Sequence, residues 1–458
     1  MDFQEAFAGH TEMLKGLSGV DWSDIYFQRS AVKSLLFNDG KIEEVSSSSV
    51  GGCSARLQKG RRSALAVVSG VEKGAGGKAL AEACRIASVS APRQADRDFP
   101  FARPQVYFPE DVQFFRDVDA ALRHECPWIR QVTLSGSSAV RDFGVVSSEG
   151  GTTGRLQRNS FTAYVLLERE GRVESGYSAL SCTGGAKAFF QELDPEAVAR
   201  KALQEALTGL EAVECPSGAM PVVLADSAGG TIIHEACGHG MEADLVFEEQ
   251  SCFKDKIGGS VAAECVTIAD DPTIPGLYGS YDCDDEGVPA TRTVLVERGI
   301  LKNYLSDRRS SRLYGVPLTG NGRRMSFSSL PMPRMSNTFV LSGEDDQNEM
   351  IQRVPRGLLV CRMGGGEVNT TTGEFVFDVT QGYMIEGGKV TRPVKGASLI
   401  GSALDVLKGI KAVGKRLCME PGMCEKEGQS LPVTDGQPSL LIDGLVVGGT
   451  ATDHEIRK

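Results

Sequence analysis

The first half of the chain alternates between helical and strand-like hydrophobic patterns. Apolar residues recur at helical spacing in four segments, and the runs between them alternate apolar and polar residues as half-buried strands do. The expected helices are Phe3–Leu17, Lys78–Ala87, Glu110–His124 and a segment from Pro195 to about Gly209. The expected strands are Asp24–Gln28, Val32–Asn38, Ile42–Val50, Cys53–Leu57, Ser63–Val68, Ala139–Ser148, Phe161–Glu168 and Val173–Leu180.

Turn signals join these strands as hairpins. Asp39-Gly40 suits a two-residue hairpin turn, and Gly171 lies between the last two strands. Ala91–Pro109 contains four prolines and reads as a connector. On either side of it the order is helix, antiparallel strands, helix, and the fragments VSSSSVGGCSARLQKGRR and VSSEGGTTGRLQRNSF are loosely alike. We therefore predict an N-terminal mixed α/β domain, residues 1–215, built from duplicated hairpin and helix units.

β patterns dominate from residue 216 to residue 458. Pro221–Ala225 reads as a buried strand, Asp226-Ser227 as the cap of the helix that follows, and Ser402–Val413 as the helix of the C-terminal part. Glycine-bearing turns separate the other expected strands, which are Val266–Ala269, Thr293–Val296, Leu301–Leu305, Phe339–Ser342, Leu358–Arg362, Glu374–Val379, Tyr383–Ile385 and Leu440–Val447. The predicted fold class is α+β: the mixed α/β domain followed by a mostly antiparallel β domain, 216–458.

Composition excludes several classes of protein. The formal charge of −11 argues against direct nucleic-acid binding, which needs clustered Lys and Arg. No apolar run approaches the length of about 18 residues that a transmembrane helix needs, so no membrane association is expected. The N-terminus shows no secretory signal, and the twelve cysteines are dispersed, so we expect reduced thiols and a cytoplasmic protein.

One stretch carries the chemistry. Thr231–Asp244, TIIHEACGHGMEAD, places Glu235 directly after His234 and a second histidine, His239, five positions on. The ligand–base–ligand order is that of a zinc hydrolase, but the spacing is HExxxH instead of HExxH. Five steps of about 100° leave the two imidazoles about 140° apart on a regular α-helix. Both reach one metal ion only if the turn at Ala236–Gly238 is widened or broken. Taken alone, the pattern is equally consistent with a helix residue and a C-cap residue.

The metal motif and several other stretches together resemble the TldD/PmbA family of zinc-dependent peptidases, also described as modulators of DNA gyrase. These are HEACGHGMEAD, TIADDPTIPGLYGSYDCDDEGVP, TGNGRR, PRMSNTF, GGGEVNTTTGEFVF and the tail GMCEKEGQSLPV…GLVVGGT. They occur in the family's order over residues 20–450. The metal motif makes the chain similar to the TldD-like subunit, whereas the PmbA-like (TldE) paralogue lacks that motif. The resemblance implies a dimer, either a homodimer or a heterodimer with the paralogue.

The resemblance also implies the metal ligands. His234, His239 and Cys424, in GMCEKEG, match the family's two histidines and cysteine; Glu425 departs from the glycine usual after that cysteine. Other candidates for the third ligand are Cys237, which we expect in the core, Cys252 and Cys283, which packing also explains, and His454, which we expect in solvent. Glu242 and Asp244 are either partners of an imidazole or an exposed acidic loop.

Two histidines and a thiolate leave one position of a zinc ion open to water. Zinc lowers the pKa of bound water from about 15.7 to about 7, and Glu235 is the natural general base. We therefore expect one Zn²⁺ per chain and a peptidase that hydrolyses small or unfolded peptides and proteins. The alternative is a non-catalytic modulator that acts on gyrase or an antitoxin by protein–protein contact, with a structural zinc. A cysteine hydrolase is less well supported, because no nucleophile signature is present.

Three further motifs are candidates for substrate binding. Asp284 and Asp285 lie in the acidic run DCDDEG, which either positions a substrate amine or forms a solvated turn. Arg334 either binds a peptide carboxylate or braces the dimer. Gly365 and Gly366 follow a strand, and the resemblance suggests that a peptide adds to this glycine-rich edge as an extra strand.

Overall fold

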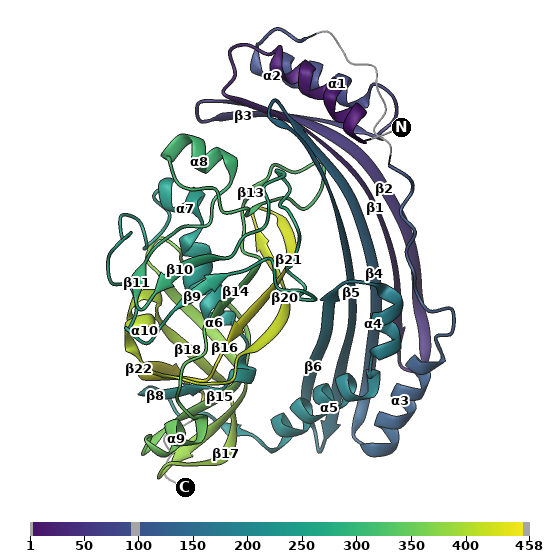
Figure 1. Cartoon of the computed structure of the whole chain (residues 1–458). Helices are drawn as coiled ribbons and strands as arrows, with labels where there is room; N and C mark the ends of the chain where they lie inside the picture. Colours follow the sequence, from purple (N-terminus) through teal and green to yellow (C-terminus); the bar gives the residue numbers. More distant parts are fainter. Residues whose placement is uncertain (1–2, 93–100, 452–458) are drawn as a thin grey trace.

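A computed structural model describes residues 3–92 and 101–451 (Figure 1). The first half forms one long, curved antiparallel sheet with its helices packed on one face. Its elements are α1 (Phe3–Lys15), β1 (Trp22–Asn38), β2 (Lys41–Lys59), β3 (Arg62–Ser69), α2 (Ala75–Ala87), α3 (Gln113–Glu125), β4 (Ile129–Ser147), β5 (Gly150–Arg169), β6 (Arg172–Thr183), α4 (Ala186–Glu192) and α5 (Pro195–Glu211). Apart from α4, each helix lies where the hydrophobic periodicity predicts one.

The topology of this half repeats. The strand order β3-β2-β1-β4-β5-β6 places two three-stranded meanders side by side, with β1 and β4 antiparallel at the centre. The predicted duplication is therefore present as a repeat of topology. The two similar sequence fragments do not follow it: Arg56 lies near the end of the middle strand β2, whereas Arg155 lies near the start of the middle strand β5.

The strands are longer than predicted, because polar and glycine positions do not interrupt them. Arg29 pairs with Gly51 and Ser30 with Val50, so that β1 and β2 each continue through a predicted break. Gly52 has a packing role, since a Cβ there would lie 2.2 Å from a ring carbon of Phe327 in the second half. The predicted hairpin turns are present, with positive φ at Asp39 and Gly40 and at Glu170 and Gly171.

The concave face of the sheet meets the second half of the chain (Figure 1). Apolar residues of β1, β4 and β5 pack there against loops of the second half, forming a small core of Tyr26, Phe143, Val145, Leu156, Tyr281 and Phe327. Buried ion pairs surround this core: Arg56 contacts Asp24 and Glu286, and Arg141 contacts Asp285. The sheet is thereby fixed to the loops that support the metal centre.

The second half is mostly β. Its strands are β7 (Val213–Glu214), β8 (Gly218–Leu224), β9 (Ile268–Asp270), β10 (Thr293–Glu297), β11 (Ile300–Leu301), β12 (Gly322–Arg323), β13 (Met332–Pro333), β14 (Asn337–Val340), β15 (Arg356–Val368), β16 (Glu374–Glu386), β17 (Lys389–Lys395), β18 (Ala397–Ser402), β19 (Ile410–Val413), β20 (Cys418–Lys426), β21 (Gln429–Gln437) and β22 (Leu440–Gly448). Helical segments are η1 (Asp226–Ala228), α6 (Thr231–Ile233), η2 (His234–Gly238), η3 (His239–Met241), α7 (Ala243–Phe247), α8 (Arg308–Tyr314), α9 (Gln347–Gln352) and α10 (Ala403–Gly409).

Two larger sheets enclose the main core of this half. One has the order β11-β10-β9-β14-β21-β20 and the other β15-β8-β22-β18-β16-β17-β7. The metal-motif helix lies between them, with Ile232, Ile233 and Ala236 in the core. The predicted α+β class is confirmed. The boundary at residue 215 stays a prediction; β7, just before it, already pairs with β17.

Three local predictions are wrong. Leu301–Leu305 is a strand only at its first residue, because β11 ends at Leu301. Ser402–Val413 is helical only as far as Gly409, because Ile410–Val413 forms β19 and pairs with β22. Asp226 does not cap the motif helix: its carboxylate binds Arg416, and Gly230 occupies the N-cap without a side-chain bond. The short helices α7, α8 and α9 were not predicted, although aspartates cap two of them: Asp307 accepts from the Ser310 amide and Asp346 from the Asn348 amide. Within the described residues, none of the helices combines the length and hydropathy needed to cross a lipid bilayer.

Candidate metal centre

The metal motif folds into a distorted helix, as its spacing predicts. Regular α-helix is confined to Thr231–Ile233, and the next five residues, His234–Gly238, form a π-turn in which the His239 amide donates to the His234 carbonyl. The extra residue per turn removes most of the offset that HExxxH has on a regular helix, and the two imidazoles therefore lie near one another. The predicted widening at Ala236–Gly238 is confirmed. Gly238 is also required sterically, because a Cβ would lie 1.9 Å from Met335 Sδ.

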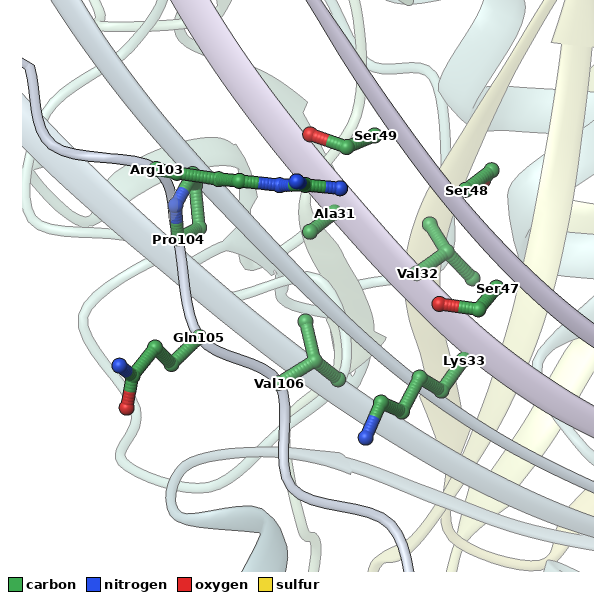
Figure 2. A pocket seen from close by; sticks show the side chains of 10 residues that line it. All are labelled: Ala31, Val32, Lys33, Ser47, Ser48, Ser49, Arg103, Pro104, Gln105 and Val106. Atoms are coloured by element: carbon green, nitrogen blue, oxygen red, sulfur yellow. The ribbon is translucent and has the colours of Figure 1, made fainter.

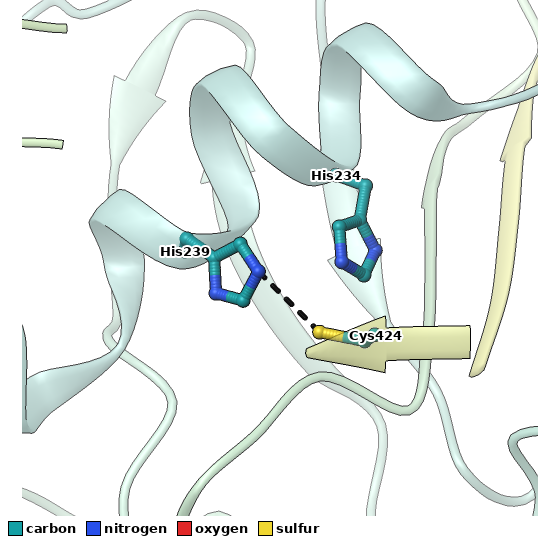
Figure 3. A group of neighbouring side chains, drawn as sticks. All are labelled: His234, His239 and Cys424. Atoms are coloured by element: carbon teal, nitrogen blue, oxygen red, sulfur yellow. Dashed lines mark hydrogen bonds between the residues drawn. The ribbon is translucent and has the colours of Figure 1, made fainter. Parts of the chain in front are cut away.

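Cys424, on strand β20, meets the two histidines from the other side (Figure 3). Its Sγ lies 3.3 Å from His239 Nε2, and one donor atom from each of the three residues lies within 4.8 Å of the others. All three residues are buried. Glu425, the departure from the family pattern, is exposed and continues the strand opposite Ser430, so it does not divert the thiol.

The spacing of the donors fits a tetrahedral zinc ion. Zinc binds sulfur at about 2.3 Å and nitrogen at about 2.05 Å. At a tetrahedral angle, the sulfur then lies about 3.6 Å from each nitrogen, and the centroids of the two imidazoles lie about 5.2 Å apart. In the structure, Cys424 Sγ lies 3.3 Å from His239 Nε2, and the centroids of the His234 and His239 rings are 5.1 Å apart, with an angle of 87° between the ring planes. The residues therefore fit the metal that the sequence predicts.

Each imidazole is oriented by a carboxylate through Nδ1, which leaves Nε2 for a metal. Asp435, on β21, lies 2.6 Å from His234 Nδ1, and Glu242 lies 3.0 Å from His239 Nδ1. Such partners fix the tautomer and the ring direction of metal-binding histidines. Glu242 was one of two carboxylates considered for this role; the other, Asp244, contacts Lys426 instead. Asp435 and Lys426 were not predicted.

Without a metal ion, the site favours a negatively charged Cys424 thiolate beside positively charged imidazoles. Burial disfavours the thiolate, but the charge of His234 and hydrogen bonds from both imidazoles lower the pKa of Cys424 from 9.0 to about 5. Burial likewise disfavours imidazolium, but the Glu242 carboxylate raises the pKa of His239 to about 9. Asp435 raises the pKa of His234 well above its ordinary value against the same effect of burial. The thiolate that a metal requires is therefore already formed at neutral pH.

This ionisation predicts the pH dependence of thiol reactivity. In chelator-treated protein, alkylation of Cys424 should have a constant rate between about pH 6.5 and 8.5, because its pKa of about 5 keeps it a thiolate throughout this range. The exposed Cys265 is an internal control, since burial raises its pKa above 9.0 and its rate should rise about tenfold per pH unit. Mass spectrometry of peptides measures both rates. A tenfold rise per unit at Cys424 would contradict the assignment.

Glu235 lies beside the donors and is accessible. Its carboxylate is 3.9 Å from His239 Nε2, and about a third of its side chain is exposed, 34%. The carboxylate therefore lies on the solvent side of the donor group, where a water molecule and a substrate can approach. The other thiols considered as ligands do not join the group: Cys237 is 1% exposed in the core, and Cys252 and Cys283 pack against apolar clusters. His454 lies outside the described residues.

The predicted substrate role of Asp284 and Asp285 does not fit their burial. Asp284 is 2% exposed and accepts hydrogen bonds from the amides of Glu286, Val288 and Gly322, so it closes a turn. Asp285 is 3% exposed; it binds Arg141 on β4 and accepts a hydrogen bond from Tyr26 on β1. Neither carboxylate is available to a substrate.

We expect Asp285→Ala to lower the free energy of unfolding by about 3–5 kcal/mol, because removing one partner of a buried ion pair strands the other. Asp282→Ala is the matched control, since Asp282 is exposed in the same acidic run. Urea unfolding followed by circular dichroism measures both. Equal losses for the two variants would show that the pair with Arg141 does not stabilise the fold.

Arg334 is also unavailable to a substrate. It is fully buried and donates to the carbonyls of Cys424, at 2.6 Å, and Gln429, at 2.9 Å. Gly365 and Gly366 are exposed near the end of β15, where β16 pairs on one side. On the other side, β8 pairs only as far as Val360, and the rest of that edge faces no strand among the described residues. Gly366 also avoids a clash with the Phe377 ring.

One pocket lies far from this chemistry. The connector segment 103–106 crosses β1 and β2 and encloses a space lined by Lys33, Ser47, Ser49 and Arg103 (Figure 2). Lys33 and Ser47 are paired, and they lie on the same face of the sheet as Leu35, which packs against α3. The second half of the chain packs on the opposite face through Tyr26. The pocket is therefore on the other side of the sheet from the metal centre.

A buried His₂Cys donor set with an accessible glutamate beside it defines the class of metal-dependent hydrolases. Family comparisons agree. The model of the PmbA/TldA metallopeptidase family matches in three parts: domain 1 over residues 23–91, the central domain over 103–210 and the C-terminal domain over 217–449. The chain belongs to this family and is a peptidase-type hydrolase.

Individual relatives give the same result. The metalloprotease TldD homolog of Haemophilus influenzae is 38% identical over 94% of this chain and 93% of the relative. The zinc metalloprotease TldD homolog of Saccharolobus solfataricus is 30% identical over 70% of this chain and 67% of the relative. These names support a metal cofactor, for which the three converging side chains are the candidate ligands.

Solved structures share the fold over nearly the whole chain. A proposed modulator of a DNA gyrase from Thermotoga maritima has a TM-score of 0.75 at 21% identity, covering 97% of this chain and all of that one. TldE from Thermococcus kodakarensis has a TM-score of 0.74 at 19% identity, covering 98% of this chain and all of that one.

Proposed function

We propose that the chain is a zinc-dependent peptidase that hydrolyses small or unfolded peptides and proteins. One zinc ion per chain would be held by His234, His239 and Cys424. The observation that carries the proposal is the tetrahedral spacing of these three donors next to Glu235. A relative named as a zinc metalloprotease supports the choice of metal.

The residues supply the steps of peptide hydrolysis. A zinc ion held by His234, His239 and Cys424 would supply Lewis acidity, which polarises a carbonyl and activates water near neutral pH. Glu235 accepts the proton of the attacking water and later donates it to the leaving amine, which general acid–base catalysis requires of one group within hydrogen-bond reach. During these steps Asp435 keeps the His234 imidazole in a fixed orientation, and Glu242 does the same for the His239 imidazole.

The edge of β15 is the proposed binding surface for the peptide. Residues 361–368 pair with β16 on one side only among the described residues, and Ser227, just before the metal-motif helix, donates to the Cys361 carbonyl. A peptide added here as a strand gains main-chain hydrogen bonds that do not depend on its sequence. Gly365 and Gly366 leave that edge without side chains, consistent with a broad substrate range.

The proposal includes a partner subunit and a cytoplasmic location. We infer a dimer, either of two copies or with a PmbA/TldE-like paralogue, and the shared fold with TldE supports the second form. The twelve cysteines form no disulfides, consistent with a reducing compartment. The rival function, a modulator with a structural zinc, would need four protein ligands, whereas the metal-binding group found in residues 3–92 and 101–451 has three.

Removal and return of the metal test the proposal. Dialysis against a chelator should abolish hydrolysis of an unstructured fluorogenic peptide, and one equivalent of zinc per chain should restore it, because Glu235 alone cannot lower the pKa of water toward 7 as zinc does. Magnesium at the same concentration is the control, since a His₂Cys set favours zinc. Unchanged hydrolysis after verified removal of zinc would overturn the proposed function.

A further inference from the structure

The hairpin β20–β21 supplies half of the metal centre. It carries Cys424 on one strand and Asp435, the partner of His234, on the other, whereas both histidines and Glu235 come from the motif helix. Residues 182 or more positions apart in sequence must therefore meet within hydrogen-bond distance. Strand pairing secures only the base of this hairpin, because β21 pairs with β14 only along Thr434–Gly436. Side-chain hydrogen bonds hold its tip, among them those of Gln429 with the Met325 amide and the Leu330 carbonyl.

Lys426 connects the hairpin to the helix. Its ammonium lies 2.9 Å from Glu242 Oε2 and 2.8 Å from both oxygens of Asp244, and 3.3 Å from the Pro333 carbonyl. Only 7% of the lysine side chain is exposed, and Glu242 is fully buried. Each carboxylate oxygen and each ammonium proton in the group therefore has little access to water, and the bridge is not a screened surface ion pair.

The lysine and the thiol act from the same face of one strand. Cys424 and Lys426 are two residues apart on β20, and side chains at this spacing project together. The thiol reaches His239 Nε2 while the ammonium reaches Glu242, whose same oxygen contacts His239 Nδ1. Strand β20 therefore contacts both nitrogens of the His239 imidazole. The Cys424 thiol contacts Nε2 directly, and Lys426 is linked to Nδ1 through the Glu242 carboxylate.

Arg334 fixes the backbone of the same strand. Its guanidinium donates to the carbonyls of Cys424 and Gln429, which lie on opposite sides of the hairpin turn. This pair of bonds sets the position of the Cys424 main chain, and Lys426 sets its distance from the helix.

We propose that Lys426 is a positioning residue of the metal centre, which holds the strand of Cys424 against the helix of His239 by bridging Glu242 and Asp244. The inference rests on the proposed function in taking these residues as zinc ligands. It makes the site preassembled: the lysine holds the two halves together before metal arrives, and removing it leaves the ligands present but no longer fixed.

Zinc affinity tests this role directly, by competition with a chromophoric chelator. Lys426→Met should weaken zinc binding about 10–100-fold, the effect usual for loss of a group that orients a metal ligand. Because it also leaves two buried carboxylates without their cation, the double variant Lys426→Met/Asp244→Asn is measured beside it. The double variant removes one negative charge and should regain the wild-type urea midpoint, yet still bind zinc at least about tenfold more weakly.

Lys254→Met is the matched control, because it breaks an exposed ion pair with Glu249 in the same half of the chain and should leave zinc affinity unchanged. The proposal is overturned if the double variant unfolds like the wild type and binds zinc with wild-type affinity, since Lys426 would then only balance charge. Peptide hydrolysis is measured separately. If the wild type binds zinc but cleaves nothing, the proposed function fails, whereas weaker zinc binding by both Lys426 variants still supports the positioning role.

Discussion

Replacing Glu235 by glutamine should lower kcat for an unstructured peptide by about 10²–10⁴-fold and leave zinc content at the wild-type level. Glutamine has nearly the shape of glutamate but cannot accept the proton of the attacking water. The loss should fall on kcat with little change in KM, because the side chain acts on the reacting atoms and not on the rest of the peptide.

The control for this variant is Glu264→Gln. Glu264 is a largely exposed glutamate of the same half, 77% accessible, with a surface ion pair to Arg298. Steady-state kinetics and metal analysis on the same preparations give both readouts. A Glu235→Gln protein that keeps its zinc and its peptidase activity would show that another group is the general base.

Cys424→Ala should remove zinc and activity together. In structural zinc sites with four protein ligands, binding of about 10–16 kcal/mol amounts to roughly 3 kcal/mol per ligand, so loss of the thiolate should lower zinc affinity by about 10²–10³-fold. The methyl group of alanine causes little steric change, so the circular dichroism spectrum should be that of the wild type.

Cys252→Ala separates the thiolate ligand from its sequence rival. Cys252 is partly buried against the core and contacts no member of the donor group, so its variant should bind zinc as the wild type does. Loss of zinc from Cys252→Ala but not from Cys424→Ala would exchange the two assignments.

Local patterns predicted most of the first half and the shape of the motif helix. Hydrophobic periodicity located α1, α2, α3 and α5, and the Asp39-Gly40 signal located a hairpin turn. The five-residue spacing of His234 and His239 led to the expectation of a widened or broken turn, because a regular α-helix would hold the two imidazoles too far apart for one metal ion, and the structure shows the widened form.

Long-range contacts are the part that local patterns could not show. Asp435 lies 201 residues from His234 in sequence, and in TDGQ it reads as an ordinary turn residue. Asp284 and Asp285 look solvated in an acidic run, yet they are buried because arginines and main-chain amides from distant segments satisfy them. Among these residues, only Lys426 could have been linked to the site from the sequence, because it lies two positions after Cys424 and side chains at that spacing on a strand point to the same face.

The central claim is that one zinc ion is bound by two imidazoles and one thiolate, with a position left open for water. X-ray absorption at the zinc edge of the loaded protein measures this coordination. The structure predicts one sulfur at about 2.3 Å and three nitrogen or oxygen atoms at about 2.0–2.2 Å, two of them imidazole. A first shell without sulfur, or one filled by four protein ligands, would contradict it.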